Sequence, residues 1–149
     1  MSNKMRDLCG VVMVMFLFAI LVSCACPSGG TKEIPQEVQE VLGNKWLAYV
    51  LTRADEIIFE AEAIKTADGE KVGYALVEGC LKCEDVIIYN YCYRTIIVQV
   101  GYSATMTAII LVHEAAHHDV SRADICDNMS EEYATSIEFK FQEERRKNL

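Results

Sequence analysis

The histidines of this chain are confined to one short stretch near its C-terminal end, and this stretch constrains the fold more than any other. All three histidines of the 149-residue sequence lie within residues 109–118, which read IILVHEAAHH. On an α-helix, residues i and i+4 project from the same face about one turn apart, so His113 and His117 face a common point. The sequence has no glycine or proline from Ser103 to its end, and the residues before His113 are almost all apolar. We therefore expect a buried helix here, because a helix that is apolar on every side lies in the protein interior.

The residue between these histidines adds a chemical function to their spacing. Glu114 follows the first of them, which completes the pattern His-Glu-x-x-His. In this pattern the two imidazoles bind one zinc ion, and the glutamate is the general base for a zinc-bound water. A catalytic zinc ion takes three protein ligands and keeps a fourth position open, so a third ligand is needed. The following residues offer several carboxylates for this position: Asp119, Asp124, Asp127, Glu131 and Glu132.

The C-terminal third of the chain resembles the gluzincin metallopeptidases. The resemblance rests on His113-Glu114-Ala115-Ala116-His117 and on a Glu-x-x-Ala step from Glu131 to Ala134. The longer metzincin pattern does not fit, because Val120 and Ala123 stand where it requires a glycine and a further ligand. The resemblance implies that Glu131 is the third zinc ligand, on a helix packed beside the first, and that the protein hydrolyses peptide bonds. It also implies an edge strand that holds the peptide, for which residues 86–89 and 96–100 are available, and an oxyanion-stabilising group, for which the chain offers Tyr102, His118, Arg122 and Tyr133.

The N-terminal segment has the features of an export signal. Lys4 and Arg6 precede a nearly uninterrupted apolar run that extends to Val22. The run closes on small residues before Cys24, which resembles the lipobox of bacterial lipoproteins and implies cleavage before Cys24 and lipid attachment to it. The expected organisation is therefore a signal peptide in residues 1–23, a flexible lipid-anchored leash in residues 24–32 and a metallopeptidase domain in residues 33–149.

The charge of the chain limits its partners. The formal net charge is −8, and loss of Lys4, Arg6 and Asp7 with the signal peptide changes it to −9. An acidic protein is a poor ligand for nucleic acid and for anionic lipid. We therefore expect a peptide or protein substrate, no nucleic acid, and a position in the bacterial cell envelope, outside the cytoplasm, with the lipid on Cys24 as the membrane contact.

The apolar periodicity predicts an α+β fold. Apolar residues recur at helical spacing in residues 34–42, Gly43 interrupts them, and a second apolar stripe continues from Leu47 to Ala61. After the turn signal Asp68-Gly69, β-branched and alternating runs predict three short strands, at residues 72–77, 86–89 and 95–100. Strands grouped between an N-terminal helix and a C-terminal pair of helices indicate a small antiparallel sheet, with the zinc site on the two packed helices.

The cysteines leave two further interpretations open. Four of them belong to the expected domain and allow three disulfide pairings, which persist in an oxidising compartment. Two of the four form a Cys-x-x-Cys motif, which is typical of redox proteins, and a four-cysteine zinc site would use all of them. The alternatives to a peptidase are therefore a non-enzymatic envelope lipoprotein that uses a metallopeptidase-like fold to bind a partner, and a zinc-binding or redox lipoprotein. The four cysteines are Cys80, Cys83, Cys92 and Cys126.

Overall fold

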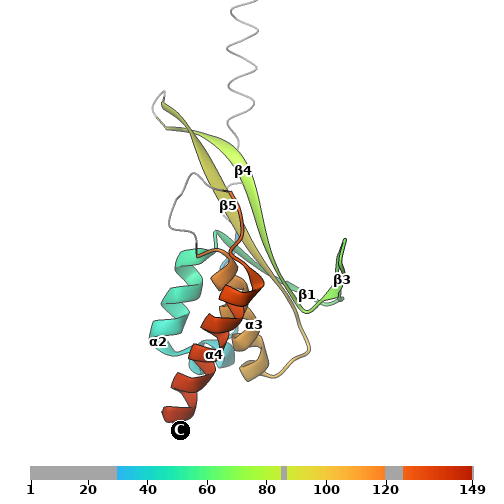
Figure 1. Ribbon diagram of the computed structural model, residues 1–149, viewed down its shortest axis with the longest axis vertical. Coiled ribbons are helices and arrows are strands. Elements are labelled where there is room, and N and C mark those ends of the chain that lie inside the picture. Colours follow the sequence, from blue (N-terminus) through green and yellow to red (C-terminus); the bar gives the residue numbers. More distant parts are fainter. Residues whose placement is uncertain (1–29, 85–86, 120–125, 149) are drawn as a thin grey trace, which may run out of the picture.

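The fold is α+β, as the sequence predicts, with three helices packed against one part of a small sheet (Figure 1). The structure, a computed structural model, describes residues 30–84, 87–119 and 126–148, and the side chains of residues 80–84 and 87–90 are outside this description. The predicted signal peptide, Cys24 and most of the leash therefore lie outside the described residues. None of the helices in the described part of the chain is long and apolar enough to span a membrane.

Helix α2 (Gln36–Arg53) is two helical segments joined at a kink. Gly43 has φ 64° and ψ 171° inside the helix, a left-handed conformation that glycine adopts without steric cost. The predicted break at Gly43 is therefore confirmed. The residues that face the core recur every four positions across the kink: Val38, Leu42, Trp46 and Val50.

The predicted second stripe is correct as far as Arg53 and wrong beyond it. The chain leaves the helix at Ala54 and continues as strand β1 (Glu56–Glu60). This segment is hydrogen-bonded to strand β5. The Asp55 N–H donates to the Arg94 carbonyl at 2.8 Å, and the Arg94 N–H donates to the Asp55 carboxylate at 2.9 Å. Long-range pairing therefore overrides a pattern that also fits a helix.

The main sheet has the strand order β1-β5-β4 and is mixed. Strand β4 (Gly73–Glu84) pairs antiparallel with β5 (Ile87–Gln99), while β1 pairs parallel with β5. Residues 87–89 and 95–99, from two of the predicted strands, both belong to β5, so the three expected strands are two long ones. The far half of this β4–β5 ribbon extends beyond the helices (Figure 1). Strands β2 (Ile64–Thr66) and β3 (Gly69–Lys71) form a separate antiparallel hairpin.

Helix α3 (Ala104–His117) is the centre of the core. It packs between α2 and α4 (Glu131–Lys147) and against β4 and β5. Serine side chains cap both C-terminal helices: Ser103 accepts from the Met106 N–H and Ser130 from the Tyr133 N–H. The predicted pair of packed helices is therefore confirmed. Their histidines and acidic residues face the start of β4.

Candidate metal centre

The two histidines of the His-Glu-x-x-His pattern face one point, as their spacing predicts. His113 and His117 lie on the same side of α3 with ring centroids 5.1 Å apart. Their side chains are 15 % and 13 % exposed, so both rings reach the surface from a buried helix. The helix thus holds the two imidazoles in fixed positions beside each other.

Each ring is oriented by a bond to its other nitrogen. His113 Nδ1 lies 3.0 Å from Glu138 Oε2, and His117 Nδ1 lies 2.7 Å from the Met129 carbonyl oxygen. The Met129 N–H in turn donates to the His117 carbonyl at 2.7 Å. Because a carboxylate and a carbonyl accept hydrogen bonds, each Nδ1 carries the proton and each Nε2 presents its lone pair in the neutral ring.

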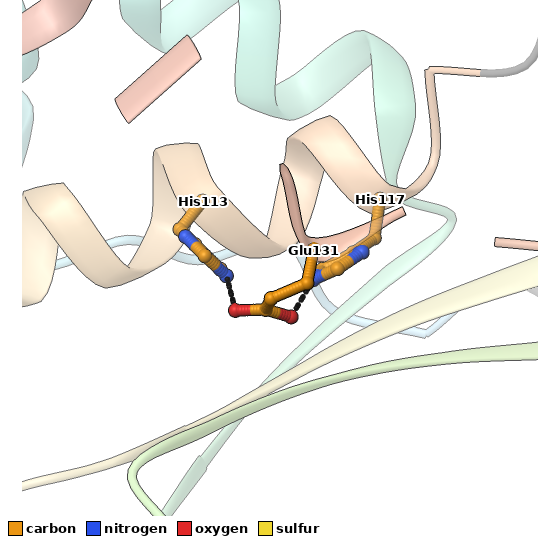
Figure 2. A group of neighbouring side chains, drawn as sticks. All are labelled: His113, His117 and Glu131. Carbon is orange, nitrogen blue, oxygen red and sulfur yellow. Dashed lines mark ion pairs between the residues drawn. The ribbon is translucent and has the colours of Figure 1, made fainter. Parts of the chain in front are cut away.

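The carboxylate of Glu131 lies between the two Nε2 atoms (Figure 2). Oε1 lies 3.0 Å from His113 Nε2 and Oε2 lies 3.2 Å from His117 Nε2. The ligand atoms of the three residues lie within 4.8 Å of one another, which makes them a group that could hold a metal ion. The structure thus brings together the three residues proposed as ligands from the sequence.

These residues fit a metal ion on chemical grounds. Two neutral imidazole lone pairs that face a carboxylate repel it unless a cation lies between them. Two ligand atoms of a tetrahedral zinc ion lie about 3.3 Å apart when each metal–ligand bond is about 2.0 Å long. The observed N···O separations of 3.0 and 3.2 Å are close to this value. A histidine whose second nitrogen bonds a carboxylate or a carbonyl is the usual arrangement around a bound metal.

The other carboxylates considered for the third position do not join this group. Asp119 bonds Arg53, Tyr49 and Tyr133 on another side of the helix, and the Asp127 side chain accepts from the Asn128 N–H. Glu132 is exposed and outside the cluster, while Asp124 lies outside the described residues.

Glu114 is buried beside the histidines and lies against strand β4. Its residue is 8 % exposed, and burial is the main cause that raises its pKa to about 7. The charges of His113 and Lys71 and a backbone hydrogen bond from Ala75 lower the pKa, while Glu131 raises it. A group with a pKa near neutrality can both accept and return a proton, which is what general acid–base catalysis requires.

A cavity of about 260 Å³ connects these groups. Among the described residues, β4 is an edge strand of the sheet, and its first residues form one wall. The lining combines the metal group with residues from β4, the β2–β3 hairpin and the segment before α4: Asp68, Lys71, Gly73, Tyr74, Ala75, His113, Glu114, His117, Asn128, Met129 and Glu131. A larger cavity of about 520 Å³ lies between the kink of α2 and the end of α4 and contains no histidine.

Four residues near the site were not predicted from the sequence. Glu138 carries a signal that could have been used, since it lies two helical turns after Glu131 on the same face of α4. Lys71, Tyr74 and Asn128 carry no local signal, because tertiary packing alone brings them to the cavity. Asn128 Nδ2 donates to the Ala75 carbonyl at 3.0 Å, which ties the segment before α4 to the edge strand.

The candidate oxyanion stabilisers are placed elsewhere. The Tyr133 hydroxyl donates to Asp119 at 2.6 Å, and this bond raises the pKa of Tyr133. His118 is buried at 1 % exposure, its Nδ1 lies 3.1 Å from the Arg53 carbonyl, and burial lowers its pKa to about 4. Tyr102 is exposed and does not line the cavity. Arg122 lies outside the described residues.

One of the possible disulfides forms. Cys92 on β5 is bonded to Cys126, with the Cα atoms 5.2 Å apart. The side chains of Cys80 and Cys83 lie outside the description, so the Cys-x-x-Cys interpretation stays a prediction. The observed bond closes a loop that contains all of α3, and its second cysteine begins the segment that leads to Met129 and Glu131.

Comparison of the chain with protein-family models, with curated proteins and with solved structures finds no match.

Proposed function

We propose that the protein is a zinc-dependent metallopeptidase of minimal gluzincin type, anchored by a lipid on Cys24 to the bacterial cell envelope and facing away from the cytoplasm. The observation that carries the proposal is the Glu131 carboxylate held between the two histidine Nε2 atoms, with the buried Glu114 beside them. The chemistry of the ligands, two imidazoles and one carboxylate, favours zinc. The Cys92–Cys126 disulfide supports a location outside the cytoplasm.

Each residue of the group has a role in this reaction. His113, His117 and Glu131 would hold the metal, and a zinc ion there would supply activation of a water molecule and polarisation of the scissile carbonyl. Glu114 takes a proton from the attacking water and returns it to the leaving amine, so that one amide and one water become a carboxylic acid and an amine. Glu138 and Met129 orient the imidazoles.

The edge of β4 supplies a binding surface for the substrate backbone. The Ala75 N–H donates to Glu114 and its carbonyl accepts from Asn128, so both groups point away from β5. In an antiparallel pair this direction alternates, and Gly73 and Val77 therefore also present their backbone groups to this edge. The Ala75 groups are already bonded, so the peptide backbone pairs with Gly73, and a peptide added there by β-augmentation lies beside the metal group. In the described structure, residues 96–99 of β5 lie between β1 and β4 and have no free edge, whereas residues 87–89, in the other segment considered for this role from the sequence, pair only with β4.

The test combines metal analysis with hydrolysis. Full-length protein purified without added metal should contain one zinc ion per chain and should cleave unstructured peptides. Glu114→Gln should retain the zinc and lose activity by about 10²- to 10⁴-fold, the usual contribution of a general base. Glu132→Gln is the matched control, because it changes an exposed carboxylate next to the metal group but outside it.

Each alternative result has a clear meaning. If the wild-type protein binds no zinc, the metal site is wrong. If it binds zinc and cleaves no peptide, the non-enzymatic envelope lipoprotein becomes the better interpretation.

A further inference from the structure

The β2–β3 hairpin places a lysine in the cavity of the metal group. Lys71 is the last residue of β3 and lines the cavity together with His113, His117 and Glu131. Its charge lowers the pKa of Glu114, the proposed general base, which lines the same cavity. The only other charged residue that the hairpin contributes to the described lining is Asp68.

Lys71 makes no ion pair with the carboxylates whose side chains the structure describes. Asp68, which lines the same cavity, is one of them. The other charges at the cavity are the three carboxylates and the two histidines already described, in a chain with a formal net charge of −8. An unpaired cation here is suited to an anionic group of a ligand, because a charge-assisted hydrogen bond to a carboxylate is stronger than a neutral one.

The direction of β4 determines which end of a peptide meets Lys71. Gly73 lies against Ile110 and Glu114, because a Cβ atom at this position would come within 2.5 Å of both side chains. Ala75 lies further along, at Glu114 and Asn128, and Lys71 precedes Gly73. A peptide that pairs antiparallel with β4, the more stable orientation, therefore runs from Ala75 past Gly73 toward Lys71. Its C-terminal end is the end that arrives at the ammonium group.

The cavity beside Gly73 and Lys71 is small. Its volume of about 260 Å³ is below the ~300–1,000 Å³ typical of small-molecule pockets. A short segment after the scissile bond fits this space, with its free carboxylate on the side of the cavity that Lys71 lines.

From these observations, and resting on the peptidase function proposed above, we propose that Lys71 binds the C-terminal carboxylate of the substrate, so that the protein removes short segments from the C-termini of peptides. Lys71 is a substrate-binding residue in this scheme. Glu114 and the metal ligands keep their roles.

The test measures binding separately from turnover. Zinc-loaded Glu114→Gln is titrated with an apolar tetrapeptide carrying a free C-terminal carboxylate and with the C-terminal amide of the same peptide. The acid should bind roughly fivefold to tenfold more tightly than the amide, as expected for one partly exposed charged hydrogen bond. A third peptide, amidated and ending in a glutamate side chain, shows whether a side-chain carboxylate serves equally well.

Variants of the hairpin identify the residue responsible. In the Glu114→Gln background, Lys71→Met should abolish the preference for the acid and Lys71→Arg should retain it. Lys65→Met is the matched control: Lys65 pairs with Glu70 and Lys71 with Ile64, so the two lysines lie on opposite faces of one hairpin. A preference that survives Lys71→Met, or that is lost in Lys65→Met, overturns the proposal.

Turnover by the wild-type protein separates this proposal from the one it rests on. Faster cleavage of the acid, near its C-terminus and with a raised KM in Lys71→Met, is the expected result. Equal cleavage of the acid and the amide overturns the role of Lys71 and leaves the peptidase function standing. Cleavage of neither peptide overturns the peptidase function itself.

Discussion

His117 and His118 are neighbours in the sequence but belong to two regions of opposite character. His117 faces the cavity, where two histidines and the carboxylate of Glu131 meet. His118 faces the back of α3, beside a cluster in which Asp119 accepts three hydrogen bonds.

The Asp119 carboxylate at the back of the helix has three hydrogen-bond donors. Asp119 accepts from Arg53 at 3.0 Å, from Tyr133 at 2.6 Å and from Tyr49 at 3.4 Å, and the Arg53 guanidinium stacks on the Tyr49 ring at 3.7 Å. A carboxylate next to a histidine is therefore paired with an arginine and two tyrosines on one side of the helix, whereas the carboxylate on the other side meets only histidines among the described residues. We expect the Asp119 cluster to stabilise the fold, and the group of His113, His117 and Glu131 could hold a metal ion.

The largest expected effect concerns the metal group of His113, His117 and Glu131. Glu131→Ala should lower zinc affinity by roughly a hundredfold to a thousandfold, because an apparent binding free energy of about 10–16 kcal/mol is shared among few ligands. Competition with a chromogenic chelator measures this affinity. Glu132→Ala is the control and should bind zinc as the wild type does, since Glu132 lies outside the group. Equal losses in the two variants would remove the distinction between these neighbouring glutamates.

The second prediction concerns the cluster around Asp119 at the back of α3. Asp119→Ala should lower the free energy of unfolding of the metal-free protein by about 2–3 kcal/mol, because Arg53 and two tyrosine hydroxyls lose their acceptor. Chemical denaturation in the presence of a chelator measures it. Asp127→Ala, an exposed carboxylate with a local hydrogen bond, should change this free energy by less than about 0.5 kcal/mol. The folded Asp119→Ala variant should still bind one zinc ion per chain. Loss of zinc binding would show that the metal group depends on the Asp119 cluster.

The third prediction concerns the residue that links α4 to the metal group. Glu138→Ala should weaken zinc binding by about tenfold, because His113 Nδ1 loses the carboxylate that orients the ring. Glu143→Ala is the control on the same helix, since Glu143 makes a surface pair with Lys147. Unchanged zinc affinity in Glu138→Ala would mean that helix packing alone orients His113.

Local patterns predicted the parts of the site that lie close together in the sequence. The i, i+4 spacing fixed the direction of His113 and His117, whereas Glu131 was selected among several carboxylates only by the resemblance to the gluzincins. The α+β fold class and the kink at Gly43 were also accessible, because apolar periodicity and glycine act locally.

Tertiary contacts determined the rest. The apolar run in β1 fits a helical stripe and a strand equally well, and pairing with β5 decides between them. The sequence pattern separated the two runs of β5, but the strand continues through the residues between them because these pair with β4. Lys71 and Asn128 reach the cavity from two other elements, so no spacing along the chain could reveal them.

The smallest expected effect tests how closely strand β4 approaches Glu114. Gly73→Ala should destabilise the protein by about 1 kcal/mol, as overpacking does, because its Cβ would lie 2.5 Å from Glu114 Oε1 and from Ile110 Cγ2. Gly79→Ala, on the same strand, places its Cβ in ordinary contact 3.5 Å from the Cys126 sulfur and should be neutral or slightly stabilising. Thermal unfolding of the two variants measures the difference. Gly73→Ala should also slow peptide hydrolysis, since the displaced group is the proposed general base, whereas equal stability and activity in both variants would mean that β4 does not constrain Glu114.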